Sequence, residues 1–131
     1  MILSPVLILT LLASNPSPTP VDLTQTECIA DAIYAEARSE PLAAQVRVAS
    51  AVLNRGEPCI VVRRPNAFAT PLPHLEAQAW TSAVWVAILV QSGAVRRSRA
   101  THFHDTSVRP YWVKGMTFLG QSGTMKFWVK A

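Results

Sequence analysis

The sequence predicts an α+β fold that is mainly helical and ends in a small C-terminal β-hairpin. Apolar residues recur at helical spacing through residues 26–38, 39–55 and 75–92, which predicts three helices. Beyond residue 99 the pattern changes to alternation, followed by two short apolar runs around a glycine-containing turn. The chain has 131 residues, 50% hydrophobic and 15% charged, which suffices for one compact core. We therefore expect a single domain.

The first two helices have recognisable ends. The first is expected over residues 26–38, with Thr24 or Thr26 as its N-cap, because a hydroxyl oxygen can accept from the free amides of the first turn. The second is expected to begin at Ser39 as its N-cap and to end at Arg55, before a glycine. It is apolar on more than one side, which predicts a central, buried helix.

The second half of the chain changes character twice. Four prolines predict loop with short turns over residues 57–76. A third helix follows over residues 75–92, and we expect Trp80 and Trp85 to pack in the core. The segment "THFHDTSVRPYW" then begins with an alternation typical of an extended strand, and "MTFLGQSGTMKFWV" predicts a hairpin that turns around residues 120–123.

The N-terminal stretch "MILSPVLILTLLASNPSPTP" holds an apolar run from Val6 to Ala13 and then a Ser/Pro-rich tail. This run is shorter than the roughly 20 residues that a membrane-spanning helix needs, but it has the length of a signal-peptide core. We interpret residues 1–21 as a signal-like apolar segment and Pro-rich linker, serving as a secretory signal or an N-terminal membrane tether. The alternative is a partly apolar extension with no targeting role. Residues 22–131 would form the functional domain.

Two cysteines, Cys28 and Cys59, agree with export. In an exported protein an even pair predicts a disulfide, here closing a loop of about 30 residues and stabilising the fold by roughly 3 kcal/mol. In a cytosolic protein the same residues would be two buried thiols. Because the linker and the signal-like start point the same way, we expect an exported protein with a disulfide.

The net charge of +4 favours an anionic partner, such as nucleic acid, anionic lipid or bacterial cell-wall polymer. Arginines gather at Arg63 and Arg64 and again at Arg96, Arg97 and Arg99. No stacking aromatics interleave with them and no known nucleic-acid motif surrounds them, so we expect a solvated basic face and no nucleic-acid partner. The sequence also has no glycine-rich phosphate loop and no G-x-S-x-G elbow.

Glu36 occupies an unusual position for a carboxylate. In a helix, Ile29, Ala32, Ile33 and Glu36 fall on one apolar face. Burying an unpaired carboxylate there would cost several kcal/mol or raise its pKa, and such an acid can protonate the leaving oxygen of a glycosidic bond. The alternative is a structural ion pair, for example with Arg38.

His102 and His104 form a second candidate constellation. Two residues apart in a strand, both imidazoles lie on the same face, as a catalytic pair or a metal site requires. With Asp105 or His74 they could supply three zinc ligands. The alternative is a pair of hydrogen-bonded histidines beside a cleft.

Several segments together resemble one known family. These segments are "ECIADAIYAEARSEP", "QVRVASAVLNR", "PCIVV", "NAFAT" and "ATHFHDTSVRPYW". Their order and spacing resemble those of the cell wall hydrolase family that includes the spore cortex-lytic enzymes. The resemblance covers about residues 27–129. It implies a lysozyme-like domain of the lytic transglycosylase type that acts on peptidoglycan glycan strands, with no cofactor and no catalytic metal. It also supports the disulfide, because some family members have cysteines at the two matching positions.

The resemblance implies that Glu36 is the catalytic acid. Protonated Glu36 would cleave the bond between N-acetylmuramic acid and N-acetylglucosamine, and its carboxylate would then take the proton of the muramic acid 6-hydroxyl. That closes a 1,6-anhydro ring without a second carboxylate. An inverting or retaining muramidase or glucosaminidase would need one, for which Glu40 and Asp105 are the candidates.

The resemblance also implies a sugar-binding groove. Phe68 and Thr70 match the family's groove loop, and His102, Phe103 and Tyr111 are candidates for the groove wall. We expect a monomer in the periplasm or cell envelope with peptidoglycan glycan strands as its partner. Two other interpretations stay open: a zinc amidase that uses the two histidines, and a non-enzymatic basic module that binds cell wall.

The chain departs from the family pattern at four places. Ser39 stands where the family usually has glycine, the loop between Arg55 and Cys59 and the segment of residues 71–76 are shorter than usual, and the family's W-C-like feature after the loop is missing. A shortened cleft wall affects the expected substrate subsites rather than the acid.

Overall fold

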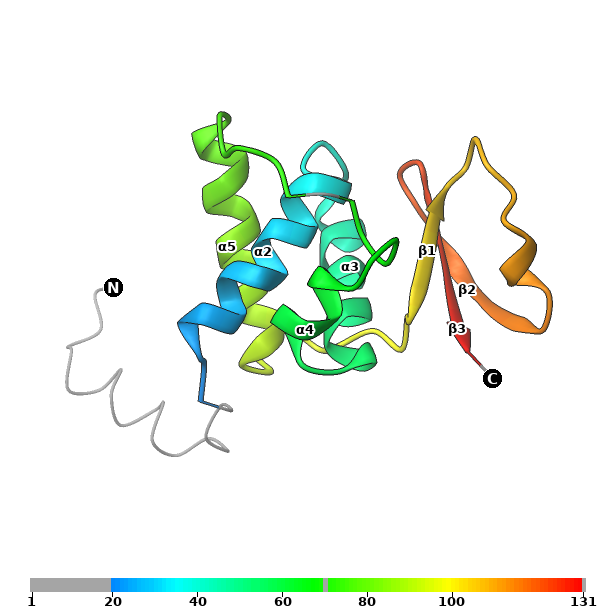
Figure 1. The fold of residues 1–131 in the computed structure, drawn as a ribbon, viewed down its shortest axis with the longest axis horizontal. Helices are drawn as coiled ribbons and strands as arrows, with labels where there is room; N and C mark the ends of the chain where they lie inside the picture. Colours follow the sequence, from blue (N-terminus) through cyan, green and yellow to red (C-terminus); the bar gives the residue numbers. More distant parts are fainter. Residues whose placement is uncertain (1–19, 70, 131) are drawn as a thin grey trace, which may run out of the picture.

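A computed structural model describes residues 20–69 and 71–130 of the chain. In these ranges four α-helices lie together on one side and a three-stranded antiparallel sheet lies on the other (Figure 1). The predicted α+β, mainly helical fold with a C-terminal hairpin is confirmed. The signal-like run lies within residues 1–19, outside the described residues. Among the helices of the described part, none is long and apolar enough to cross a membrane.

Helix α2 (Leu23–Ala37) begins slightly earlier than predicted. Its N-cap is Asp22, whose Oδ1 accepts hydrogen bonds from the amides of the first turn, including that of Thr24 at 2.9 Å. The predicted caps Thr24 and Thr26 were therefore wrong, because the carboxylate two residues earlier satisfies these donors. Thr26 instead donates from its hydroxyl to Gln91 Oε1 at 2.6 Å, which joins α2 to α5 (Ala77–Gln91).

Helix α3 (Leu42–Arg55) begins three residues after Ser39, so the predicted cap at Ser39 was wrong. Ser39 belongs to the tight turn that joins α2 to α3. Gln45 is buried and supplies hydrogen bonds to two backbone carbonyl groups of this turn. Its side-chain amide donates to the carbonyl oxygens of Ala37 and Glu40, both at 3.2 Å. This connection holds the C-terminal end of α2 close to the start of α3.

The segment predicted as loop contains one short helix, α4 (Pro58–Arg63), before α5 (Ala77–Gln91) begins. Trp80 is partly buried and packs against the core, as predicted. Trp85 is 60% exposed, so its predicted place in the core was wrong. Because α5 is apolar on nearly every side, spacing alone could not identify the side that faces the other helices.

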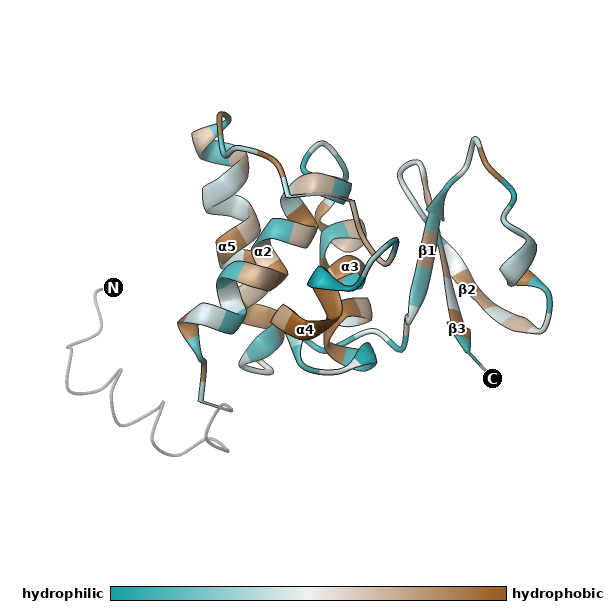
Figure 2. Ribbon diagram, in the orientation of Figure 1, coloured by the Kyte–Doolittle hydropathy of each residue, from teal (hydrophilic) through white to brown (hydrophobic). Residues whose placement is uncertain are grey.

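The core lies between the helices and extends to one face of the sheet. Figure 2 shows strongly hydrophobic segments among the helices, whereas β1 (His102–Asp105) is largely hydrophilic. Fully buried side chains come from every helix and from the last strand: Ile29, Ile33, Val48, Val52, Val61, Val90 and Phe127. The disulfide between Cys28 and Cys59 joins α2 to α4 with a Cα–Cα distance of 5.1 Å, which confirms the predicted pair.

The sheet has the order β1–β3–β2, with both pairs antiparallel. Strands β2 (Met116–Ser122) and β3 (Met125–Lys130) form the predicted hairpin, and β1 pairs with the other side of β3. Phe103 pairs with the buried Phe127, so one face of the sheet joins the helical core. This leaves β1 as one wall of a cleft next to the helices.

The hairpin turn lies later than predicted. It is formed at Gly123, with φ +58°, and the following threonine, whereas Gly120 lies within β2 at an irregularity in the pairing. The sheet is fixed to α3 by Arg47, whose guanidinium donates to Ser122 Oγ at 2.8 Å and lies over the Phe127 ring. These contacts set the position of the sheet relative to the helices.

Candidate active site

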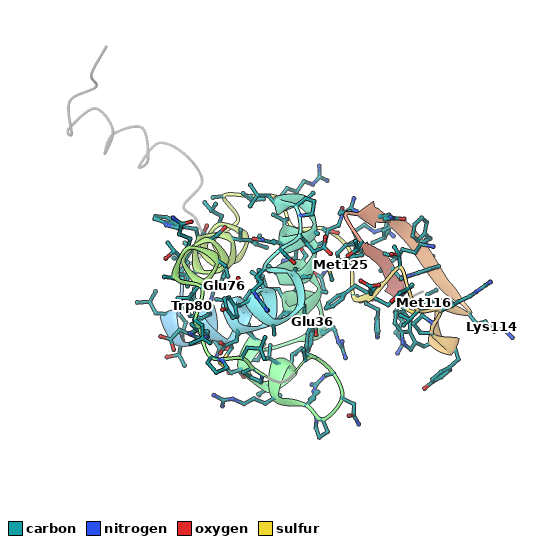
Figure 3. All side chains as sticks on the ribbon, turned by 90° about the horizontal axis from the view of Figure 1, so that it is seen from above. Glu36, Glu76, Trp80, Lys114, Met116 and Met125 are labelled. Carbon is teal, nitrogen blue, oxygen red and sulfur yellow. A yellow bond between two sulfur atoms is a disulfide. The ribbon has the colours of Figure 1, made fainter. Side chains whose placement is uncertain are left out.

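A cleft of about 560 Å³ lies between the helices and β1. Figure 3 places Glu36 on the side of α2 toward the sheet, and Met125, the first residue of β3, at the edge of the sheet that faces the helices. The cleft is lined by Glu36, Glu40, Arg55, Asn66, Ala67, Phe68, Ala69, His102, Phe103, His104, Asp105, Trp112 and Met125. The structure therefore brings together residues from α2, α3, the loop after α4, β1 and the 3₁₀ helix η1 (Tyr111–Val113).

Glu36 lies in the last turn of α2 and is half-buried. The three residues that precede it on the same helix face, Ile29, Ala32 and Ile33, are buried as the spacing predicted. The backbone amide of Ala69 donates to Glu36 Oε1 at 2.6 Å. This bond orients the carboxyl group in the cleft, and no other described residue donates to it.

The alternative explanation of Glu36 as the partner of Arg38 is wrong. Arg38 donates from Nε to Glu76 Oε2 at 2.6 Å and from its terminal nitrogen to the carbonyl oxygen of Tyr34 at 3.2 Å. Its guanidinium is thus held by Glu76 and Tyr34, and Arg38 does not line the cleft. Glu36 has no arginine or lysine partner among the described residues.

Aromatic rings form an apolar part of the cleft. Phe68, from the loop after α4, lies 5.8 Å from Phe103 of β1 between ring centroids, and Phe103 lies 5.9 Å from the buried Phe127. The guanidinium of Arg55 lies 5.2 Å from the centroid of the Phe68 ring. Phe68 and Phe103 are therefore both in the cleft, as the sequence predicted.

His102 and His104 lie on the same side of β1, and both contact Trp112. The centroid distances from the Trp112 ring are 5.4 Å for His102 and 5.6 Å for His104. His74 lies elsewhere, stacked on Trp80 at 3.4 Å and hydrogen-bonded to Asp31 Oδ1 at 2.7 Å. His74 therefore does not complete a three-ligand zinc site.

Among the described residues no group of three or more histidine, cysteine or acidic side chains could hold a metal ion. This includes the set of His102, His104 and Asp105 that the sequence offered as zinc ligands. The pair agrees better with the alternative of two histidines beside a cleft. His102 Nδ1 is hydrogen-bonded to the Thr101 hydroxyl, and His104 Nδ1 donates to the carbonyl oxygen of Asp105.

Positive charge dominates one flank of the cleft. Burial lowers the pKa of His102, and the positive charges of Arg55 and Lys130 lower it further, which favours the neutral imidazole. Burial also lowers the pKa of Arg55, with an added contribution from the positive charge of Arg64. Asp105 is an exposed carboxyl group in the same cleft. Hydrogen bonds from Ser107 lower its pKa, which favours the charged carboxylate.

Both candidates for a second carboxylate line the cleft but hold neighbouring loops. Glu40 accepts hydrogen bonds from the backbone amide of Thr124 at 3.2 Å and from the Thr124 hydroxyl. It thereby joins the α2–α3 turn to the β2–β3 turn. Asp105 accepts from the amide of Ser107 at 2.8 Å, within the loop that follows β1. Each carboxylate therefore has a structural role.

The groove residues predicted from the sequence do not all reach the cleft. Tyr111 is 89% exposed and does not line the cleft, so its predicted position was wrong. Its neighbour Trp112 takes the place, because a 3₁₀ helix turns successive side chains by about a third of a revolution. Thr70 lies outside the described residues.

Sequence reasoning missed Trp112, Arg55 and Asn66. All three belong to segments quoted for the family resemblance, which was a usable signal. Helical spacing marked Arg55 only as the end of a helix. Tyr111 and Trp112 are adjacent in the sequence, and nothing in the pattern indicated which of the two rings faces the cleft. Asn66, with φ 60°, belongs to a loop whose path depends on the rest of the fold.

Neither the protein-family models nor the curated proteins compared with the sequence give a match. Two solved structures do share the fold. The catalytic domain of the Bacillus cereus SleB protein is 21% identical, with 86% of this chain and 94% of that domain aligned at a TM-score of 0.63. The catalytic domain of the germination-specific lytic transglycosylase SleB from Bacillus anthracis is also 21% identical. Here 85% of this chain and 98% of that domain are aligned at a TM-score of 0.66. The chain therefore has the fold of the SleB catalytic domains.

Proposed function

We propose that the protein is a lytic transglycosylase that cleaves the glycan strands of peptidoglycan with Glu36 as its catalytic acid. The observation that carries this proposal is the half-buried Glu36, which lies in the cleft without a basic partner among the described residues and accepts a hydrogen bond from Ala69. The fold supports it, because one SleB domain of this fold is described as a lytic transglycosylase.

The proposed reaction needs one carboxyl group in two protonation states. Protonated Glu36 donates its proton to the glycosidic oxygen between N-acetylmuramic acid and N-acetylglucosamine as the bond to the muramyl C1 breaks. The resulting carboxylate takes the proton of the muramyl 6-hydroxyl while O6 bonds to C1. Glu36 ends protonated, no water is consumed, and the product carries a 1,6-anhydro ring.

The Ala69 amide has a defined part in this proposal. Because it donates to Glu36 Oε1, that oxygen is occupied as an acceptor, and the other oxygen is left to carry the proton. The loop that supplies Ala69 also supplies Phe68, whose ring can stack on a sugar face. One loop would thus orient both the acid and the substrate.

A hydrolase on the same scaffold would need a second carboxylate to act as nucleophile or to activate water. The hydrogen bonds of Glu40 to Thr124 and of Asp105 to Ser107 favour structural roles for both candidates. We therefore prefer the single-acid route.

We also propose that the protein acts as a monomer in the periplasm or cell envelope, with residues 1–21 as its export signal or tether and residues 22–131 as its catalytic domain. The test is fractionation of cells that express the full chain or a chain without residues 1–21. Recovery of both chains in the cytoplasm would contradict export.

The experiment for the catalytic claim compares the wild type with Glu36→Gln and Glu27→Gln on purified sacculi. Glu27 is an exposed carboxylate on the same helix, outside the cleft, and is therefore a matched control. We expect soluble anhydro-muropeptides from the wild type and the Glu27→Gln variant only, by mass spectrometry. Urea unfolding should show little loss of stability in Glu36→Gln. Equal release of fragments by all three proteins would refute the role of Glu36.

A further inference from the structure

One cation in the cleft has no counter-charge. Arg55, at the end of α3, is half-buried and holds its guanidinium over the Phe68 ring. The two ion pairs among the described residues are Arg38 with Glu76 and His74 with Asp31, so neither includes Arg55. A guanidinium has five N–H donors, and none of those of Arg55 is among the buried polar atoms that lack a partner in the described residues, so they are open to the cleft. The Arg55 donors are therefore available to a ligand that enters the cleft.

The other arginines near the helix–sheet boundary show the contrast. Arg38 donates to Glu76, and Arg47 donates to Ser122 in β2. Both hold one structural element to another. Arg55 donates to no described residue, although its stacking on Phe68 fixes its direction at the cleft. The contacts of Arg38 and Arg47 stabilise the fold, whereas no hydrogen bond of this kind to a described residue explains the position of Arg55.

A second hollow extends the basic flank beyond Arg55. It has a volume of about 350 Å³, shares His102 and Trp112 with the cleft, and is lined also by Lys114 and Lys130. Figure 3 shows Lys114 at the far side of the sheet from Glu36. A ligand bound at Glu36 could therefore send a substituent past His102 along a path lined by positive charges.

The field at His102 agrees with this arrangement. The charges that lower its pKa, after burial, are those of Arg55 and Lys130. Both cations are thus close enough to act on the His102 imidazole. The carboxylates of the cleft come from both sides: Glu36 and Glu40 lie on the α2 side, and Asp105, which accepts from the amide of Ser107, lies at the end of β1.

We propose that Arg55, with Lys130 beside His102, binds a carboxylate that is carried on the lactyl group of the muramyl residue. This inference rests on the proposed function and names the part of the substrate that the cleft selects. N-acetylmuramic acid differs from N-acetylglucosamine by a 3-O-lactyl ether. Its carboxyl is either free or joined to a peptide that has carboxylates of its own. A planar guanidinium binds a carboxylate through two parallel hydrogen bonds, which gives both affinity and direction.

The site would therefore select muramyl-containing strands over neutral polymers of N-acetylglucosamine. The stacking of Arg55 on Phe68 reduces the freedom that the side chain loses on binding, so more of the interaction appears as affinity. Lys130, a flexible point charge, would contribute less direction and would tolerate either a free lactyl carboxylate or one further along a peptide.

The test measures binding to the Glu36→Gln protein, which does not turn over its ligand under the proposed function. Calorimetry would compare five tetrasaccharides: a muramyl ligand with a free lactyl carboxylate, its methylamide, a muramyl ligand carrying a stem peptide, the methylamide of that peptide-bearing ligand, and a chain of N-acetylglucosamine alone. We expect the carboxylate ligand to bind at least about tenfold more tightly than its methylamide. Equal affinity for those two ligands, together with no effect of methylamidation on the peptide-bearing ligand, would overturn the proposal.

Two further variants assign the effect to the residue. Arg55→Gln in the same background should remove the preference for the carboxylate, and Arg63→Gln, an exposed arginine outside the cleft, should retain it. Loss of the preference in both variants, or in neither, would refute the assignment to Arg55. If Arg55→Gln fails to fold, the comparison of each ligand with its methylamide still decides the proposal without that variant.

The two sources of the carboxylate separate in the same experiment. A preference seen with the free lactyl ligand assigns the site to the lactyl group. A preference seen only between the peptide-bearing ligand and its methylamide assigns it to the peptide. The proposed function fails separately: it fails if the wild type releases no glycan fragments. If Arg55→Gln and wild type cleave carboxylated and methylamidated strands at equal rates, the function stands and this subsite is refuted.

Discussion

Replacement of Gly123 by alanine tests how the sheet is held against the cleft. Gly123 has φ +58°, where an alanine costs about 1–2 kcal/mol. A Cβ built there would also overlap the carboxylate of Glu40 and lie 2.7 Å from Pro41 Cδ. Overpacking of this kind costs about 1–3 kcal/mol, so we expect a total loss of about 2–5 kcal/mol in the free energy of unfolding.

Gly93→Ala is the matched control, because it separates the two contributions. Gly93 has φ +82°, and a Cβ there would have no described atom within 4 Å. This variant should lose only the backbone contribution of about 1–2 kcal/mol. Urea unfolding followed by tryptophan fluorescence measures both variants. Equal losses would show that the β2–β3 turn is not packed against Glu40, and would refute the contact that joins this turn to the cleft.

Three other predictions follow from the same contacts. The NMR titration of His102 should have a midpoint below the ordinary pKa of 6.5. Arg55→Gln should raise this midpoint, because it removes a positive charge near the imidazole. A midpoint that is unchanged in the variant would contradict the influence of Arg55 on His102. Because this pKa is depressed on folding, the stability linked to His102 is present above the ordinary value and is lost as the pH falls through the depressed one. Reduction of the disulfide, whose cysteines are 31 residues apart, should lower the free energy of unfolding by about 3–4 kcal/mol. Urea unfolding with and without reductant measures this loss. No change would mean that the bond does not constrain the unfolded chain. Trp112→Ala should weaken the binding of glycan to the Glu36→Gln protein and Tyr111→Ala should not, by calorimetry; the reverse would place the wrong aromatic residue in the cleft.

The position of Glu36 was predictable because it depends on local geometry alone. Helical spacing fixes which residues share a face, and Ile29 and Ile33 on that face are buried as expected. The same argument failed for Trp85, because α5 is apolar on nearly every side and its spacing contains no preferred direction. Only its packing against α2 and α3 decides which residues face water.

The contacts that organise the cleft could not be predicted from spacing. The bond from Ala69 to Glu36 joins residues 33 apart, and that from Thr124 to Glu40 joins residues 84 apart. Such contacts depend on the paths of loops, which a periodic pattern does not encode. The N-cap at Asp22 was missed for a different reason, since two threonines nearby were equally good candidates by sequence.

The central claim is that one carboxyl group cleaves the strand without water. The most direct measurement digests purified sacculi in heavy-oxygen water and analyses the new muramyl ends by mass spectrometry. The account predicts 1,6-anhydro ends that carry no heavy oxygen, and none of them from Glu36→Gln. Reducing muramyl ends that contain one heavy oxygen would contradict it, because they require attack by water and hence a second catalytic carboxylate.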